Sequence, residues 1–109
     1  MFVTVSTYKA KAGEEDAIIA LHEDWQHRQQ PHARSYLSGE LLKNVEASRE
    51  FIAIMWFESQ EAAQALTNDP ERKVWYQRLV SLTEDTPIHT EHTSEWQTPD
   101  GMLIVIPPG

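Results

Sequence analysis

Residues 51–57 are apolar on both faces that a β-strand would present. The seven side chains alternate between two sets, Phe51, Ala53, Met55 and Phe57 on one face and Ile52, Ile54 and Trp56 on the other. An antiparallel strand with one face in water would instead alternate apolar and polar side chains. A single layer of helices can cover only one face of a small sheet. We therefore expect the other face to pack against a second subunit.

Composition excludes several classes of function. The 109 residues correspond to one domain, and 9 Lys+Arg against 17 Asp+Glu leave a net charge of −8, which argues against nucleic acid or an anionic membrane as partner. The absence of Cys excludes thiolate nucleophiles, iron–sulfur clusters, cysteine-ligated zinc and disulfides. The N-terminus has no secretory signal pattern, and the longest apolar run is far shorter than the roughly 20 residues of a membrane helix. We expect a cytoplasmic protein.

The first half of the chain predicts a strand, a helix and a second strand. Residues 2–10 are rich in β-branched and aromatic side chains, and Gly13 ends that pattern. Acidic residues at 14–16 suit a helix N-terminus, and Pro31 should end the helix. One face of this helix is apolar, with Ala17, Ile18, Leu21 and Trp25 at helical spacing. Residues 35–45 are expected to form the second strand, with Gly39 as the candidate bulge.

The second half predicts a similar order after the strand at 51–57. Ser59 is the expected N-cap of a short helix through Leu66, and Asp69 followed by Pro70 starts a second helical piece that runs to about Leu82. On this piece Val74, Trp75 and Leu79 fall on one stripe. Residues 88–98 are expected to form a strand.

The combined order, β-α-β twice, predicts an α+β, ferredoxin-like domain with an antiparallel four-stranded sheet and its helices on one face. We assign this domain to residues 2–98. Residues 99–109 are then a C-terminal extension in which 102–106 form a short apolar strand along a sheet edge.

Several segments in this order resemble the antibiotic biosynthesis monooxygenase (ABM) domains of the dimeric α+β-barrel superfamily. The matching segments are Val-Thr-Val at 3–5, Lys-Ala-Gly-Glu-Glu at 11–15, Ser-Gly-Glu-Leu-Leu at 38–42, Phe-Ile-Ala-Ile-Met-Trp-Phe-Glu-Ser-Gln-Glu-Ala-Ala at 51–63 and Asn-Asp-Pro at 68–70. The resemblance spans residues 2 to about 96. It implies a homodimer whose two sheets pack face to face, and a small apolar cavity between each sheet and its own helices.

The family's chemistry does not carry over residue by residue. Members that degrade haem have an Asn on the first strand, a Trp in the second helical region and a His about ten residues later. The matching positions here are Ser6, Ala65 and Trp75, so haem degradation is disfavoured. Many other members have histidines around the Asp-Pro turn, where this chain has Leu66 and Glu71.

His22 is the strongest candidate for a catalytic group, because it borders the apolar face of the first helix. A neutral imidazole there could act as the base that takes a proton from an acidic substrate. The alternative is a boundary histidine that bonds water or a neighbouring carboxylate. We expect no metal site, because His22 and His27 lie about 140° apart on a helix, while His89 and His92 point to opposite faces of a strand.

The remaining candidates would line a pocket. Trp25 and Trp75, one from each helical region, are either core residues or the flat walls of a site for a planar ligand. Ser6 and Tyr36 are candidate hydrogen-bond donors to that ligand, and Trp56 is expected in the sheet or the dimer seam. No G-x-S-x-G elbow, Walker loop or G-x-G-x-x-G is present, so neither a nucleophilic serine nor a bound nucleotide cofactor is expected.

The resulting hypothesis is a cofactor-independent monooxygenase that acts on a small aromatic or conjugated molecule between sheet and helices. In this reading the substrate anion itself reacts with dioxygen, and the protein supplies a dry cavity, a base and hydrogen bonds. A non-catalytic binding or stress-response protein with the same pocket is the main alternative. An isomerase or lyase that uses proton transfer alone is a third.

Overall fold

The computed structural model describes residues 1–28 and 36–97. Seven elements follow one another along the chain: β1 (Phe2–Lys9), α1 (Glu15–Arg28), β2 (Tyr36–Lys43), β3 (Glu50–Phe57), α2 (Gln60–Thr67), α3 (Pro70–Ser81) and β4 (Ile88–Thr93). Their order confirms the predicted succession of strands and helices.

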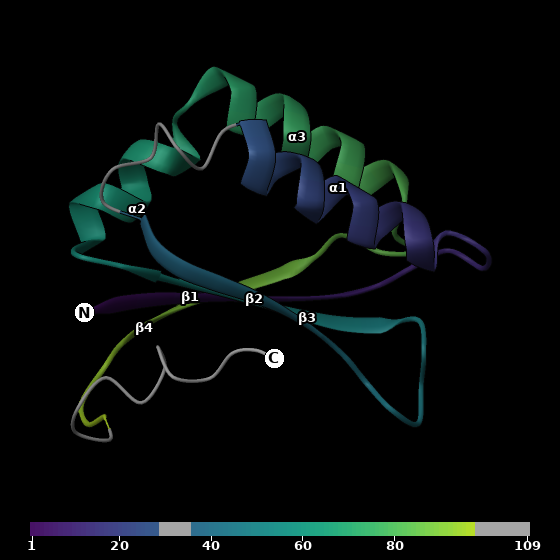
Figure 1. Ribbon diagram of the computed structural model, residues 1–109, viewed down its shortest axis with the longest axis horizontal. Coiled ribbons are helices and arrows are strands. Elements are labelled where there is room, and N and C mark those ends of the chain that lie inside the picture. Colours follow the sequence, from purple (N-terminus) through teal and green to yellow (C-terminus); the bar gives the residue numbers. More distant parts are fainter. Residues whose placement is uncertain (29–35, 98–109) are drawn as a thin grey trace.

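The four strands form one antiparallel sheet in the order β2-β3-β1-β4. Figure 1 shows all three helices on the same side of this sheet, with α1 and α3 side by side. This arrangement is the ferredoxin-like α+β fold that the sequence predicts. Its two central strands, β1 and β3, pair along their full length, from Phe2 opposite Phe57 to Lys9 opposite Glu50.

Side-chain caps begin both α2 and α3, as the sequence predicts. The Ser59 hydroxyl accepts a hydrogen bond from the backbone N–H of Ala62 at 3.1 Å. The Asp69 carboxylate accepts one from the N–H of Glu71 at 2.8 Å and one from that of Arg72 at 3.3 Å. These caps satisfy N–H groups that have no partner inside the helix. The second cap places Arg72 in the first turn of α3.

The predicted bulge at Gly39 is wrong. Gly39 pairs regularly with Met55, and the shift in register lies between Tyr36 and Ser38. Leu37 is therefore the extra residue of β2. A glycine in a strand tolerates a bulge but does not require one, because its permissive backbone also adopts ordinary extended angles.

The last strand is shorter than the predicted 88–98. Strand β4 ends at Thr93, opposite Phe2, where β1 begins. Beyond that point β1 offers no further residue to pair with, apart from a bond from the N–H of Ser94 to the carbonyl of Met1 at 2.9 Å. Trp96 lies past the strand, and 77% of its surface is exposed.

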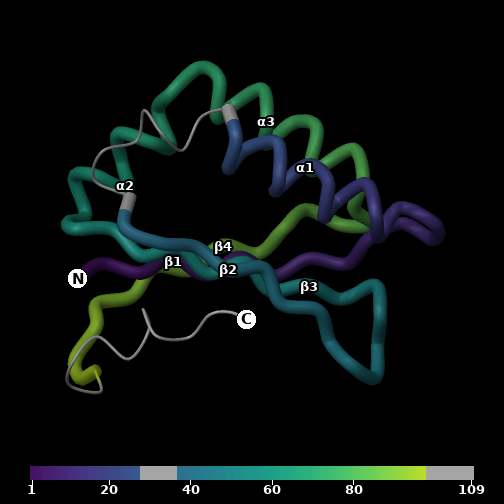
Figure 2. The backbone as a smooth tube through the Cα atoms, in the orientation of Figure 1, coloured from purple at the N-terminus to yellow at the C-terminus, as the bar shows by residue number. Residues whose placement is uncertain are grey.

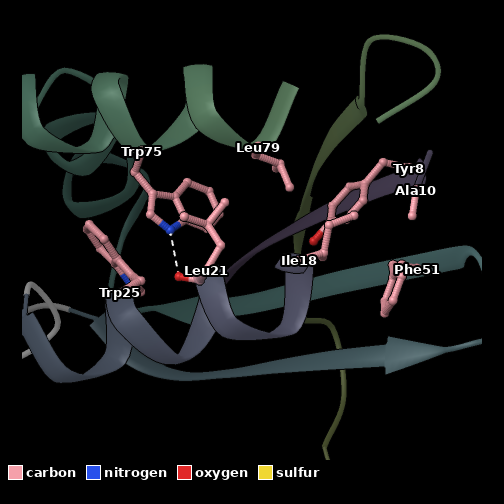
Figure 3. Packing of buried hydrophobic residues seen from close by; sticks show 8 residues of the cluster. All are labelled: Tyr8, Ala10, Ile18, Leu21, Trp25, Phe51, Trp75 and Leu79. Carbon is pink, nitrogen blue, oxygen red and sulfur yellow. Dashed lines mark hydrogen bonds between the residues drawn. The ribbon is translucent and has the colours of Figure 1, made fainter. Parts of the chain in front are cut away.

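The hydrophobic core lies between the sheet and the helices. Its larger cluster joins residues of β1, α1, β3 and α3 and the residue that follows β1, namely Tyr8, Ala10, Ile18, Leu21, Trp25, Phe51, Trp75 and Leu79 (Figure 3). The predicted apolar face of α1 is confirmed at Ile18, Leu21 and Trp25. Of the predicted stripe on α3, Trp75 and Leu79 are buried, whereas Val74 is 57% exposed.

The opposite face of the sheet is not covered by any element of the described residues. Because facing residues of paired strands share a face, Val3 and Val5 lie beside Trp56 and Ile54 there. Ile52, on the same face, is 40% exposed. Figure 2 shows the turn between β2 and β3 bending away from the helices, toward this side. We call the group Val3, Val5, Ile52, Ile54 and Trp56 the open apolar face.

Some predictions concern residues 29–35 and 98–109, outside the described parts of the chain. They are the last residues of the first helix before Pro31, the start of the second strand at Ser35, and the strand at 102–106. The backbone of Tyr36 is described, but its side chain is not. Within the described ranges, no helix has the length and apolar character needed to cross a membrane.

Candidate functional site

A cavity of about 510 Å³ lies between the sheet and the helices. Strands β1, β3 and β4 form its floor, and α1, α2 and α3 contribute the other walls. The cavity that the family resemblance implies is therefore present. Three of the candidate residues, Ser6, His22 and Trp75, line it.

Tyr8 and His22 form a buried pair in this cavity. The Tyr8 hydroxyl lies 2.5 Å from Nε2 of His22, and the two rings are nearly parallel, with centroids 6.2 Å apart. Tyr8 comes from β1 and His22 from α1, and Figure 3 shows the Tyr8 hydroxyl directed toward α1. The hydrogen-bond partner of His22 is thus the phenol of Tyr8. It is neither the water nor the neighbouring carboxylate that the alternative hypothesis proposed.

Burial keeps both members of the pair neutral. It lowers the pKa of His22 from 6.5 to about 4, and the positive charge of Arg72 lowers it further. Burial also raises the pKa of Tyr8 above its usual range, an effect that Arg72 partly opposes. At neutral pH the Tyr8 hydroxyl therefore donates to an unprotonated Nε2 of His22.

Arg72 brings a positive charge into this apolar region. Its guanidinium carbon lies 3.9 Å from the centre of the Trp75 ring and 4.4 Å from that of Trp25, and one of its N–H groups contacts the sulfur of Met55 at 3.4 Å. Stacking on the two indole faces stabilises the cation and fixes its orientation in this apolar region. An acidic ligand in the cavity would therefore meet a cation whose planar group is already oriented.

The two indoles lie together but do not wall the same cavity. Nε1 of Trp75 donates to the carbonyl of Leu21 at 2.9 Å (Figure 3), and the ring meets His22 edge-on at 5.0 Å between centroids. Trp25 instead lines a smaller neighbouring cavity of about 100 Å³, together with His22 and Arg72. Its buried Nε1 has no hydrogen-bond partner in the described parts of the chain. Pairing Trp25 with Trp75 as walls of one pocket is therefore corrected: only Trp75 borders the larger cavity.

A second polar group lies on the sheet. The Ser6 hydroxyl is 3.1 Å from Nδ1 of His89, and Nε2 of His89 is 3.6 Å from a carboxylate oxygen of Glu91. Ser6 and His89 both line the cavity. His92 lies on the other face of β4, opposite Val3, as the strand alternation predicts. We call Ser6, His89 and Glu91 the Ser6 row.

Sequence reasoning missed Tyr8, Arg72 and His89. Tyr8 is two residues from Ser6 and so shares its face of the strand, which is a signal that the sequence contains. Arg72 precedes Trp75 by three residues and therefore falls near it on the helix. The pairing of His89 with Ser6 depends on which strands are neighbours, and this becomes visible only once the sheet order is known.

Structural comparison relates the chain to proteins named as antibiotic biosynthesis monooxygenases. One from Nitrosomonas europaea is 12% identical, with 88% of this chain and 100% of that chain covered at a TM-score of 0.76. One from Deinococcus radiodurans is 16% identical, with 90% and 96% covered at 0.74. SnoaB, a cofactor-independent oxygenase from Streptomyces nogalater, is 17% identical, with 91% and 97% covered at 0.73.

At these identities the likeness concerns the fold. No protein-family model matches the sequence, and no curated protein matches it. The resemblance to ABM domains that the sequence motifs indicate is thus confirmed by the solved structures, in the fold over nearly the whole length of the chain.

Proposed function

We propose that this protein is a cofactor-independent oxygenase of a small, acidic, aromatic or conjugated molecule. The observation that carries the proposal is the cation of Arg72, stacked on Trp75 beside the neutral Tyr8–His22 pair in a cavity of about 510 Å³. The fold shared with SnoaB, itself a cofactor-independent oxygenase, supports the proposal by analogy.

The residues suit a substrate that reacts as an anion. A proton that leaves the substrate passes to the oxygen of Tyr8 while the phenolic proton of Tyr8 moves to Nε2 of His22. Because burial and Arg72 make His22 a weak base, with a pKa of about 4, the transfer needs the new anion to be stabilised. Arg72 supplies that stabilisation from a fixed position among the apolar side chains that line the cavity.

Dioxygen then acts as the oxidant. The electron-rich carbon of the anion forms a bond to one oxygen atom, which gives a peroxide. Loss of water from the peroxide leaves a carbonyl on that carbon. One oxygen atom enters the product, and the other leaves as water with the two hydrogens that the carbon carried, so that a CH₂ group becomes C=O.

Oxygen uptake tests this proposal. Purified protein is mixed with anthrone-like phenols and quinols in an oxygen electrode, and the rate is compared with that of the uncatalysed reaction. Arg72→Gln should lower kcat/KM by about 100-fold, the effect of removing one preorganised group that stabilises an anion. Arg78→Gln is the matched control, since Arg78 lies on the same helix, pairs with Asp24 at 3.7 Å and does not line the cavity. No uptake above background with any of these compounds would exclude the oxygenase.

A non-catalytic binding protein is the second candidate, and the low pKa of His22 is the observation that favours it. In that case planar anions bind and quench the fluorescence of Trp75, Arg72→Gln weakens the binding, and no oxygen is consumed. An isomerase or lyase would consume no oxygen either, but would exchange substrate hydrogen with deuterated water.

We also propose that two copies of the chain form a homodimer through the open apolar face. The apolar character of Val3, Val5, Ile54 and Trp56, and the 40% exposure of Ile52, support this proposal, because such a surface is unfavourable in water. Sedimentation should give about twice the chain mass of 12.5 kDa. Ile54→Glu should release monomers, whereas Val74→Glu, which places the same charge on an exposed helix, should not. A wild-type monomer at micromolar concentration would overturn the proposal.

A further inference from the structure

We propose that Ser6, His89 and Glu91 give the cavity a second activity, the hydrolysis of small esters through an acyl intermediate on Ser6. Its nucleophile and base are not those of the oxygenase proposal, because it uses neither Tyr8 nor His22; the two proposals share only the positive charge of Arg72. It also runs against the expectation from sequence motifs, which predict no nucleophilic serine.

The geometry is that of a nucleophile, a base and a group that orients the base. The Ser6 hydroxyl lies within hydrogen-bond distance of Nδ1 of His89, at 3.1 Å. The other ring nitrogen lies 3.6 Å from the carboxylate of Glu91, longer than a hydrogen bond but close enough for electrostatic attraction. A serine is activated as a nucleophile when its proton can pass to a base held in this way.

The carboxylate selects the tautomer that the reaction needs. A neutral imidazole carries its proton on one nitrogen only, and the proton is favoured on Nε2, where it faces the negative charge of Glu91. Nδ1 then keeps its lone pair free to accept the hydroxyl proton of Ser6. The same carboxylate stabilises the imidazolium that forms when the proton moves.

The sheet sets these positions. Ser6 and His89 are direct partners in the pairing of β1 with β4, and Thr4 and Glu91 are the next partners on the same face. His89 and Glu91 are two residues apart on β4, so both project toward the helix side. Their side chains are about half exposed, at 48% and 46%, which lets a water molecule reach an acyl group on Ser6.

The bond changes are those of ordinary acyl transfer. The oxygen of Ser6 attacks the ester carbonyl carbon while His89 takes the hydroxyl proton. The C–O bond to the alcohol breaks, and His89 returns the proton to the departing alcohol. Water, deprotonated by His89, then releases the carboxylic acid and restores Ser6. The side chains of Arg72 and Lys73, which line the same cavity, supply positive charge for the oxyanion.

The first experiment needs no variant. Wild-type protein is mixed with p-nitrophenyl acetate, and the reaction is quenched with acid. The protein is then digested, and the masses of the peptides are measured by mass spectrometry. We expect an acetyl group on the hydroxyl of Ser6 and a burst of p-nitrophenolate equal to the concentration of protein. A fluorophosphonate probe should label the same residue. Acetyl groups found only on lysines or on the N-terminus would overturn the proposal.

Variants assign the roles. Ser6→Ala should abolish the adduct, and His89→Ala should lower kcat/KM by about 100-fold or more. His27→Ala is the matched control, because His27 is an exposed imidazole outside the cavity. Glu91→Gln should lower kcat by about tenfold and leave KM unchanged, which a purely structural role would not do. Circular dichroism checks that each variant is folded. Ester hydrolysis that survives Ser6→Ala would refute the role of Ser6.

Discussion

His22 and His89 line the same cavity and each meets a hydroxyl from β1, yet their surroundings differ in every other respect. His22 is largely buried, bonds the phenol of Tyr8 and packs against the edge of Trp75. His89 is half exposed, bonds the hydroxyl of Ser6 and faces the carboxylate of Glu91. The first is held neutral by burial and by a nearby cation. The second is open to solvent and has a carboxylate beside it.

This difference shows that the burial of a histidine and the groups around it determine its chemical role. Strand β1 offers an aromatic hydroxyl at Tyr8 and an aliphatic one at Ser6, on the same face. Helices α1 and α3 cover the first, while the second lies next to the edge strand β4. The Tyr8–His22 pair should therefore contribute to stability, and the Ser6 row should contribute little.

The largest expected effect on stability comes from Trp75, which packs against the Tyr8–His22 pair. Trp75→Ala should lower the free energy of unfolding by about 3 to 5 kcal/mol, because it empties a buried site and leaves the carbonyl of Leu21 without its indole donor. Urea unfolding followed by circular dichroism measures the change. Trp96→Ala, at an indole that is 77% exposed, should change it by less than about 0.5 kcal/mol. Equal losses of unfolding free energy in the two variants would contradict the view that the region around Tyr8 and His22 is what stabilises the fold.

Acid should destabilise the fold through His22. The folded state lowers the pKa of His22 from 6.5 to about 4, so between these values the unfolded chain binds the extra proton more readily. Stability is complete above pH 6.5 and is lost as the pH falls toward 4, by about 2 to 3 kcal/mol in all. Unfolding of the wild type and of His22→Gln, measured from pH 7.5 to 4.5, should show that the variant loses less. His27→Gln should behave like the wild type.

Tyr8→Phe should have a smaller effect, a loss of about 1 kcal/mol. The ring and its packing against Phe51 remain, but Nε2 of His22 loses its donor in a buried place. Tyr76→Phe, at a tyrosine that is 41% exposed, serves as control in the same unfolding experiment. If Tyr8→Phe were neutral, the bond between phenol and imidazole would not hold the pair together.

The smallest effect on stability belongs to His89→Ala, which should change the free energy of unfolding by less than about 0.5 kcal/mol. Its contacts with Ser6 and Glu91 are exposed to solvent, where such interactions contribute little. A loss of stability as large as that of Tyr8→Phe would show that the Ser6 row supports the fold. The stabilising region would then extend to the edge strand β4.

The fold follows from local signals that the sequence contains. Ser59, Asp69 and Pro70 mark two helix starts that the structure reproduces, and the apolar run at residues 51–57 indicates a central strand of the sheet. The end of β4 at Thr93 could not be predicted in this way, because it depends on where the neighbouring strand β1 begins. The site was harder still. His22 and Ser6 are visible as candidates, but the partners that give them chemical character, Tyr8 and His89, are set by tertiary packing.

Strand β1 also sets the spacing between two hydroxyls that line the cavity. Tyr8 and Ser6 are two residues apart on an extended chain, which places their attachment points about 7 Å from each other. The Tyr8 hydroxyl extends from the strand toward α1, whereas the Ser6 hydroxyl stays beside the sheet at His89. A molecule that contacts both hydroxyls must therefore extend along the strand and also from the sheet toward the helices, which favours fused rings over a single small ring. The affinity of the protein for phenols with one, two and three fused rings tests this expectation, since affinity should rise at the first molecule that contacts both hydroxyls.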